Sequence, residues 1–586
     1  MKNETNPTKS KKAAGSGTFA GLSTKTHALI IFLSLLIWGV TFYTDTKIFS
    51  SDGLNMNCLP VDTGMIPFMH VLTKICVLLF WYGMLRFLHY GLSHKKVLIY
   101  FLCLMAIYGI GLLVTYPGYY MNDDPIIFAY VTRYLPVYWH NYLTSLFYMT
   151  GMSVFPASCG PVLLSDVCYA LTFTYLFTRG SQAYECTFAG DLTAATSITP
   201  ILQKILLILP AILPFTLLGA LMCFRPAIYS SFFLFYYLIL YFDHQQKKSL
   251  TLAKLLLLTF LTALLSHWRS ESIVLLPLSC FLIPLVYYRK NETSKDPDTA
   301  TSAPSNDQQT DHLISILRHH PLLLALSFLI ISTALFALIS VPQKHGEKAY
   351  YGSDYLIIST TRPLSVIVWR DQTYEGAEED IENISAITEF GYLHNDSLSC
   401  SAYTRYNTDH NEGRYTQTGA DAETQKKYLK SAFRLILHNL DLYFGERIQL
   451  FCVTNGFFNY NQDMVLNLKP IVSTDFHLYE HDRDYGFEML NAFLRVPLSY
   501  HDDYAMFLYK YGGEALIPML ILCLAALIYS LVKKKWFLFF SFGSLLAREA
   551  VIFLSAPASF IQYSYPTMFV TAAFCLLILG SRKSDS

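Results

Sequence analysis

Two adjacent acidic residues that follow a long apolar run are the first candidates for catalysis in this sequence. Asp123 and Asp124 lie in the stretch TYPGYYMNDDPIIF, after an apolar segment that ends near Val114. A carboxylate that is partly removed from water has a raised pKa and becomes a better general base. Adjacent carboxylates are also suitable ligands for a divalent cation. The structural alternative is a solvated loop after a helix end, in which neither acid has a chemical role.

Cationic residues near other apolar runs are candidate partners for an anionic group. The stretch SHWRSES, residues 266–272, joins two apolar runs by a short turn and places Arg269 and Glu271 near a membrane surface. A guanidinium can contact two phosphate oxygens at once, so Arg269 is a candidate phosphate ligand. An Arg–Glu pair that only closes the turn is the alternative. Arg225, in CFRPAIY, and His267 are weaker candidates of the same kind.

Another charged pair lies deep inside an apolar run. Arg548 and Glu549 occur in the middle of FLFFSFGSLLAREAVIFL. Charges at such a depth are costly and usually face a cavity or a partner. Neighbouring positions on a helix point in different directions, so the two side chains need not contact each other. Arg548 is therefore a candidate for a lipid-phosphate groove, and a structural bond between helices is the alternative.

The composition is that of a polytopic membrane protein. Hydrophobic residues make up 53% of the 586 residues, and charged residues only 15%. Apolar runs of about 17–24 residues recur, which is the length that crosses a bilayer core of roughly 30 Å. The 43 basic and 43 acidic residues balance, and no basic region indicates nucleic-acid binding. The scattered cysteines lack zinc-ligand spacing, although Cys400 and Cys452 are candidates for a disulfide.

The long polar stretch near the C-terminal end is expected to have mixed secondary structure. Residues 354–369, DYLIISTTRPLSVIVW, are rich in the β-branched residues that favour strands. Residues 422–440 place their apolar side chains at helical spacing. The expected fold class is therefore mainly α, a transmembrane helical bundle of roughly 11–13 spans. A mixed α/β domain outside the membrane precedes its last three helices.

Lysine and arginine in short loops predict the orientation of the chain. Clusters such as SHKK at 93–96 and VKKK at 532–535 should face the cytoplasm. They place both termini in the cytoplasm of a multi-pass protein, most simply one of the bacterial plasma membrane. We predict four regions: a disordered cytoplasmic tail at 1–26, a transmembrane module at 27–341 with an outer loop at 117–139 and a cytoplasmic linker at 289–320, an extracytoplasmic domain at 342–510, and C-terminal helices at 511–586.

The predicted spans contain one conflict. An even number of candidate spans precedes the polar stretch, whereas a cytoplasmic N-terminus and an outer domain require an odd number. The run at 140–155 is short and contains polar residues, so it could be re-entrant or interfacial. The run at 201–222 contains Pro210 and Pro214 and is also doubtful. The sequence leaves open which of the two is not a simple span.

Several of these motifs, in this order, resemble the GT-C superfamily of integral membrane glycosyltransferases, in particular a group of uncharacterised bacterial GT-C-like proteins. TYPGYYMNDDPIIF resembles their first outer loop, where an aspartate follows Tyr-Pro-Gly at the distance of Asp123 from Gly118. SHWRSESIVLL resembles their short arginine-containing turn. HNYLTSLFYMTG resembles the helix that they open with His-Pro, which makes His140 a further candidate.

Two later segments extend the resemblance, and three positions depart from it. NLDLYFGERIQLFCVTNGFFNY, residues 439–460, resembles the amphipathic outer segment, and IQYSYP, residues 561–566, resembles the motif near the last helix. Asn141 stands where the family has proline, and Gln562 stands where it has arginine. The Lys-Asp pair expected around 225–235 is replaced by FRPAIYSS.

The resemblance implies transfer of a sugar from a polyprenyl-phosphate carrier to a glycan, lipid or protein acceptor at the outer face of the membrane. Asp123 would activate the acceptor or bind a divalent cation, and Asp124 would assist it. The implied ligands of the donor phosphate are Arg269, Arg225, Arg548 and His140. The metal requirement, the sugar and the acceptor all stay open.

Two other functions have different requirements. A transporter or flippase for a lipid-linked glycan needs charges along a path at the membrane midplane and often an internal repeat. No repeat is evident, and Lys74, Arg548 and Glu549 are the charged residues deep in apolar runs. A non-catalytic envelope-assembly subunit would act through residues 342–510, and the departures from the family pattern leave that alternative open.

Overall fold

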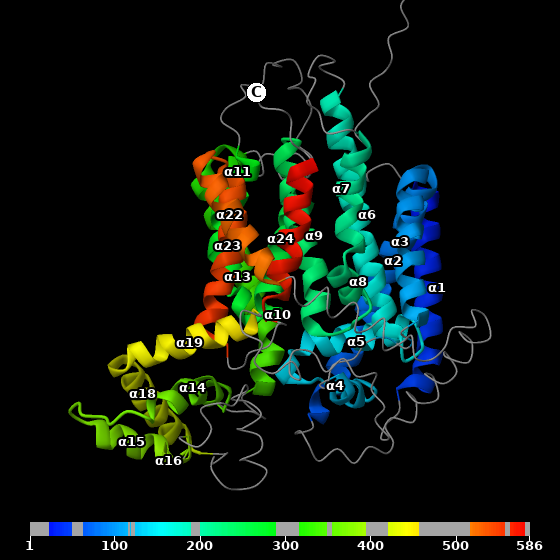
Figure 1. Ribbon diagram of the computed structural model, residues 1–586. Helices are drawn as coiled ribbons and strands as arrows, with labels where there is room; N and C mark the ends of the chain where they lie inside the picture. The colour runs from blue at the N-terminus through cyan, green and yellow to red at the C-terminus, as the bar shows by residue number, and fades with distance from the viewer. Residues whose placement is uncertain are drawn as a thin grey trace, which may run out of the picture.

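The described part of the chain is a bundle of α-helices without a β-strand (Figure 1). The computed structural model describes residues 23–49, 62–114, 116, 118, 124–188, 200–288, 316–347, 354–388, 390–393, 420–455, 516–556 and 563–580. The expected helical, multi-pass architecture is confirmed. Asp123, Cys400 and Gln562, as well as most of the tail at 1–26 and of the linker at 289–320, lie outside the described residues.

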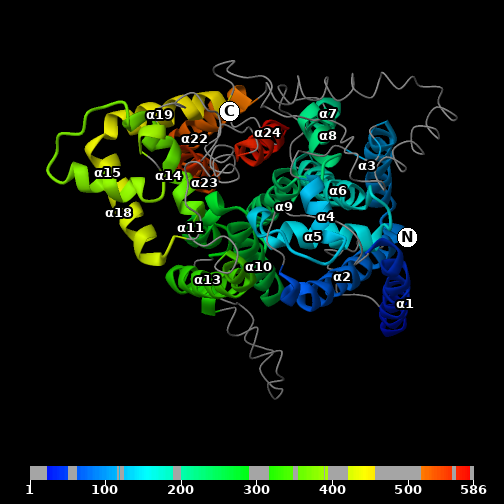
Figure 2. The same cartoon turned by 90° about the horizontal axis from the view of Figure 1, so that it is seen from below.

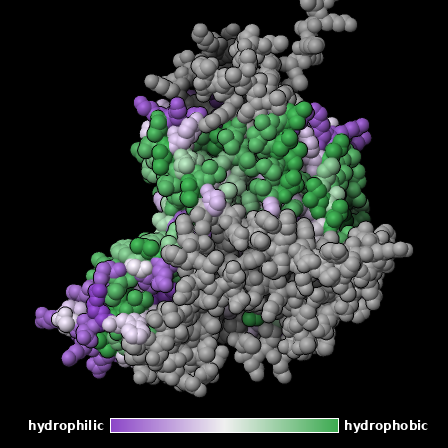
Figure 3. Space-filling model, in the orientation of Figure 1, coloured by the Kyte–Doolittle hydropathy of each residue, from purple (hydrophilic) through white to green (hydrophobic). Residues whose placement is uncertain are grey.

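Seven helices of the described residues are long and apolar enough to cross a membrane, fewer than the predicted number. They are α1 (Thr24–Ile48), α2 (Ile66–Ser93), α3 (Lys95–Val114), α6 (Gly160–Phe188), α11 (Leu275–Tyr287) with the preceding 3-10 turn η3 (Ser270–Val274), α13 (Pro321–Gly346) and α23 (Trp536–Ser555). Shorter apolar helices accompany them: α10 (Leu252–Trp268), α22 (Leu516–Val532) and α24 (Tyr565–Gly580). Figure 3 shows the apolar belt that these helices present on one face of the molecule.

Both doubtful apolar runs depart from a simple span. The run at 140–155 forms α5 (Tyr142–Val154), which has 13 residues, all of them buried within the protein. The run at 201–222 breaks at Leu213 into α7 (Pro200–Ile212) and α8 (Pro214–Ala220), whose axes differ by 46°. Proline removes a helical N–H donor and clashes with the preceding turn, so Pro214 accounts for the break.

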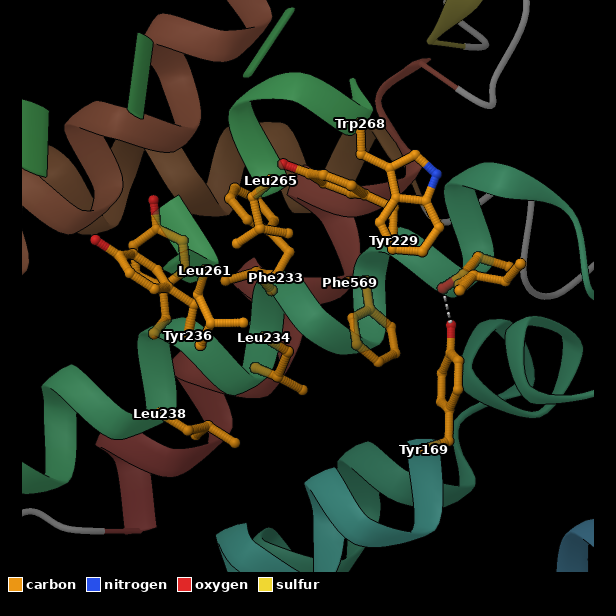
Figure 4. Close-up of a cluster of buried hydrophobic side chains, with 14 of the residues drawn as sticks. Tyr169, Tyr229, Phe233, Leu234, Tyr236, Leu238, Leu261, Leu265, Trp268 and Phe569 are labelled. Carbon is orange, nitrogen blue, oxygen red and sulfur yellow. Dashed lines mark hydrogen bonds between the residues drawn. The ribbon is translucent and has the colours of Figure 1, made fainter. Parts of the chain in front are cut away.

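The core of the bundle is rich in aromatic side chains and centres on α9 (Arg225–Gln245). This helix packs against α6, α10, α11 and α24. Its rings Tyr229, Phe233 and Tyr236 are fully buried, as Figure 4 shows. The hydroxyl of Tyr169 on α6 donates a 2.8 Å hydrogen bond to the carbonyl of Ala227, which satisfies a polar group that would otherwise be costly in this core.

A second, smaller core lies in a helical unit beside one end of the bundle, which we call the juxtamembrane unit (Figures 1 and 2). It consists of α14 (Asp354–Ile367), α15 (Ala377–Ser385), α16 (Phe390–Leu393), α18 (Ala422–His438) and α19 (Leu440–Thr454). The expected mixed α/β structure is not supported, because residues 354–367 form a helix. Leu364 and Ile367 bury their side chains in the core that Leu435 shares, and this burial outweighs the strand preference of β-branched residues.

Replacing Leu435 with alanine is expected to destabilise the juxtamembrane unit by about 2–5 kcal/mol, because a buried leucine leaves a cavity. Its side chain is 0% exposed, whereas that of Leu437 on the same helix is 51% exposed. Leu437→Ala is therefore the matched control. Hydrogen exchange of α14 and α18, measured by mass spectrometry in detergent, should rise strongly only in Leu435→Ala. An equal rise in both variants would contradict the packing described here.

Candidate functional site

A buried cluster of arginine and glutamate residues joins the end of α10 to α23. Arg269 is the residue at which α10 ends, and Glu271 lies in the following turn η3. The Nε atom of Arg269 donates to Oε1 of Glu271 at 2.6 Å. The same oxygen accepts a 2.8 Å hydrogen bond from Nη2 of Arg548, which is 277 residues further along the chain. The turn and the deep arginine, two separate sequence candidates, therefore share one carboxylate.

Arg548 is almost fully committed to contacts within the protein. Its Nε donates to Ser272 Oγ at 3.1 Å, and Nη1 donates to the Tyr563 carbonyl at 2.7 Å and to Thr567 Oγ1 at 3.2 Å. Nη1 also contacts Glu549 Oε1 at 3.3 Å, so these neighbours on α23 do form an ion pair. Arg548 thus holds η3, α23 and the start of α24 together, which favours a positioning role over direct ligand binding.

Arg269 keeps unused capacity for a hydrogen bond. Its side chain is 1% exposed, and within the described residues its Nη1 atom has no hydrogen-bond partner. The centre of the guanidinium lies 5.7 Å from the ring of Tyr563. A buried donor without an acceptor is costly, so such a group in a folded protein calls for an explanation. An anion at this position would provide the missing acceptor.

Arg447 on α19 is a further buried arginine, which the sequence analysis did not single out. Its Nε pairs with Glu446, and its Nη1 donates to the Ala556 carbonyl at the end of α23 at 2.7 Å. Its Nη2, like Nη1 of Arg269, lacks a hydrogen-bond partner among the described residues. In the sequence, the charged residues of GERIQLF are typical of a solvent-exposed surface. The amphipathic pattern of the surrounding segment, residues 439–460, is the feature that could have indicated a buried arginine.

The two arginines border the same aromatic residue. Tyr563 packs against a small cluster of Leu450, Ile552 and Ala556, the last of which binds Arg447. Tyr563 also carries the ring that faces Arg269. The juxtamembrane unit and the turn after α10 therefore meet at the end of α23. One buried, incompletely bonded guanidinium group, that of Arg269, faces Tyr563 directly, and the other, that of Arg447, binds the carbonyl of Ala556 in the cluster on which Tyr563 packs.

Asp124 lies buried at the start of a short helix. It begins α4 (Asp124–Val131), is fully buried and accepts a 2.7 Å hydrogen bond from the hydroxyl of Tyr148 on α5. The thiol of Cys223 lies beside both side chains. Asp123 is outside the described residues, so the pairing of the two aspartates on a cation stays a prediction. The described part of the chain holds no group of three or more His, Cys, Asp or Glu residues suited to a metal ion.

The segment before α9 connects Asp124 with the arginine cluster. Cys223 lies near Asp124, and Arg225, two residues later, acts electrostatically on Glu271. His140 ends the 3-10 turn η2 (Tyr138–His140), stacks on Trp139 with ring centroids 5.1 Å apart and faces Phe224 at 6.4 Å. The predicted residues that the structure describes are thus linked through a series of neighbouring side chains. They are Asp124, His140, Arg225, Arg269 and Arg548.

Comparison with models of protein families, with curated proteins and with solved structures gives no match. The resemblance to GT-C proteins therefore remains a prediction from the short motifs. The arrangement of the buried arginines is an independent observation from the structure.

Proposed function

We propose that the chain is an integral membrane glycosyltransferase of the GT-C type, which transfers a sugar from a polyprenyl-phosphate carrier to an acceptor of the cell envelope. The observation that carries the proposal is the pair of buried, incompletely bonded guanidinium groups of Arg269 and Arg447. Arg269 lies where α10 ends, and Arg447 binds the carbonyl at the end of α23. In this proposal the lipid phosphate binds at these helix ends. Planar guanidinium groups suit phosphate because they bind two oxygens at once.

The chemistry divides between these cations and the first loop. Negative charge grows on the leaving lipid phosphate during sugar transfer, and preorganised cations at that position lower the barrier. Arg269 and Arg447 would provide them, with Arg225 and His140 nearby. Glu271 and Arg548 hold Arg269 in place through their hydrogen bonds. Asp123 would remove the proton of the acceptor hydroxyl or amine, or bind a divalent cation that does so.

The distribution of basic loops supports an outer location for this site. α1 approaches the site at its C-terminal end, where Asp45 accepts a 2.9 Å hydrogen bond from Tyr134. α24 begins there, directly after Tyr563. Thr24 and Gly580 therefore lie at the other end of the bundle, together with the lysines that follow α2 and α22. By the excess of lysine and arginine in cytoplasmic loops, the arginine cluster faces outward.

Polyprenyl phosphate is expected to stabilise the purified protein against thermal unfolding. A ligand that binds only the folded state at about 100 times its Kd contributes about 2.7 kcal/mol. Arg447→Gln should remove most of this effect. Arg370→Gln should retain it, because Arg370 is exposed and pairs with Asp441 at 2.6 Å on the juxtamembrane unit. Unfolding in detergent, followed with polyprenyl phosphate and with the uncharged polyprenol, measures the shift.

Two outcomes would count against this proposal. An equal shift with polyprenol would mean that the isoprenoid chain alone is bound. A shift that Arg447→Gln leaves intact would remove the role given to the buried guanidinium groups.

A further inference from the structure

A second unusual polar group lies far from the arginine cluster in the sequence, within the apolar part of α6. Asp166 is 0% exposed, and within the described residues neither carboxyl oxygen has a hydrogen-bond partner. Other buried aspartates of the bundle are paired. Asp45 binds Lys74, and Asp243 binds Lys254 at 2.8 Å. An isolated, buried carboxylate is too costly to persist as a bare charge, so Asp166 must be neutralised by something that binds it.

The face of α6 that carries Asp166 packs against the broken helix. Val162, Asp166 and Tyr169 recur at helical spacing and so lie on one face. Gly118 lies so close to Val162 that a side chain on Gly118 would clash with it. The carbonyl of Leu221, just after α8, lies beside the same glycine. The hydroxyl of Tyr169 lies against Gly219 within α8. Asp166, between these two positions, is therefore directed toward the region of α8.

Hydroxyl groups from other helices satisfy the backbone that the break leaves open. The hydroxyl of Tyr108 on α3 donates to the Ala211 carbonyl at 3.0 Å. That of Tyr565 on α24 donates to the Phe215 carbonyl at 2.5 Å. Tyr108 also lies within electrostatic range of Asp166. The carboxyl and the break between α7 and α8 therefore share a neighbour, the hydroxyl of Tyr108.

We propose that Asp166 is a proton-binding site inside the membrane, and that its proton controls the hydrogen bond from Tyr108 to the break between α7 and α8. With the proton bound, the carboxyl is neutral and Tyr108 donates to Ala211, as observed. Dissociation gives the proton to water and leaves a carboxylate on Asp166. The Tyr108 hydroxyl then turns to this stronger, charged acceptor and releases the Ala211 carbonyl.

A proton fits this position better than a metal ion or a counter-charge. Sodium and divalent ions need several oxygen ligands, and nearby tyrosine hydroxyls already donate to backbone carbonyls. No described cationic side chain pairs with Asp166. The titratable or charged groups on the elements packed around it include Cys168 and Tyr169 on α6, Tyr108 on α3, Tyr565 on α24, Tyr148 on α5, the exposed Lys204 on α7, and Arg225 and Tyr229 on α9.

Discontinuous membrane helices with a nearby carboxyl occur where transport proteins bind ions, and charged residues inside membranes commonly mark proton relays. The chain thus carries a feature that the sugar-transfer proposal does not use. Asp166 lies on α6, whereas the residues of the arginine cluster lie at the end of α10, in η3 and on α23. Its test does not depend on any transfer activity.

Labelling with N,N′-dicyclohexylcarbodiimide tests the proposal, because this apolar reagent requires a protonated carboxyl. We expect mass spectrometry of the full-length protein in detergent to find the adduct on Asp166 at low pH. The yield should fall at least about tenfold between acidic and alkaline pH, because only the protonated carboxyl reacts. Asp243, buried but paired with Lys254, is the internal control and should stay unlabelled. Asp166→Asn should abolish the signal.

A second variant tests the role of Tyr108. Tyr108→Phe removes the donor that stabilises the carboxylate, so the midpoint of labelling should move to higher pH. The proposal is overturned if Asp166 is never labelled, or if its labelling is constant over the whole pH range. It is also overturned if sodium chloride protects Asp166 and choline chloride does not, because the occupant would then be a metal cation. An unchanged midpoint in Tyr108→Phe would remove the coupling to the helix break.

Discussion

Replacing Glu271 with glutamine is expected to lower the free energy of unfolding by about 3–5 kcal/mol, the cost of removing one partner from a buried ion pair. The carboxylate of Glu271 is shared by Arg269 and Arg548, so its loss leaves two buried guanidinium groups without their common counter-charge. The same change also removes the hydrogen bond between Glu271 in η3 and Arg548 on α23. Equilibrium unfolding in mixed micelles, followed by the helical signal, measures the loss.

The control for this variant is a glutamate whose salt bridge lies in solvent. Glu423 pairs with Lys427 at 3.6 Å on the exposed face of α18. Pairs of this kind contribute little, so Glu423→Gln should leave the unfolding curve nearly unchanged. If both variants unfold alike, the cluster does not hold η3 and α23 together. Apolar replacement of Glu271 and Arg548 together should cost less than replacement of Glu271 alone, because it leaves one buried guanidinium group, that of Arg269, without its counter-charge instead of two.

Asp123→Asn is expected to reduce sugar transfer by about 10²–10⁴-fold while the protein still folds and inserts into the membrane. The reason is that a positioned base loses its ability to accept a proton, whereas an amide of nearly the same size preserves packing. The effect should appear in turnover rather than in thermal stability. Incorporation of labelled sugar from a polyprenyl-phosphate donor into cell-envelope material measures it.

Asp124→Asn should behave in the opposite way and serves as the matched comparison. Asp124 is buried and accepts a hydrogen bond from the hydroxyl of Tyr148, and an amide in its place alters this buried contact, which is worth about 0.5–1.5 kcal/mol. The expected result is lower stability with little direct effect on the chemical step. Near-normal incorporation in Asp123→Asn would count strongly against the transferase assignment. A requirement for added divalent cation, lost in Asp123→Asn, would identify that residue as a metal ligand.

The membrane helices could be predicted from the sequence, because the length of an apolar run is a property of that segment alone. The apolar runs became α1, α2, α3, α6 and α13 with small differences in their ends. Among the described residues fewer helices than predicted have the length and composition of a span. Apolar content alone does not distinguish a spanning helix from one buried inside the protein. α5 is such a case, since it is enclosed by other helices over its whole length.

Secondary structure in the juxtamembrane unit shows the limit of local preference. Residues 354–369 carry many β-branched side chains, yet the segment packs as a helix against α18 and α19. Strand preference mainly reflects how a side chain fits its neighbours, and those neighbours are set by tertiary structure. The helical spacing at 422–440 predicted α18 correctly, although Phe433, one of its apolar positions, is exposed.

The candidate site divides in the same way. Arg269 and Arg548 could be selected from the sequence, because charge within an apolar run is rare and usually has a purpose. Arg447 could not, since charged residues on an amphipathic segment normally face water. Only its position against the end of α23 reveals its burial. Asp166 could not be selected either, because the sequence does not show whether a single acid within an apolar run has a partner on another helix.

The sequence by itself determined that this protein is a helical membrane protein, since the cost of placing polar backbone and charge in lipid leaves a chain of this composition few alternatives. It also determined which side chains were candidates for chemistry. The tertiary structure alone decided that Arg269 and Arg548 share Glu271, that Arg447 binds the end of α23, and that Asp166 has no partner among the described residues. These relations depend on how helices far apart in the chain pack together, and packing is a property of all their surfaces at once.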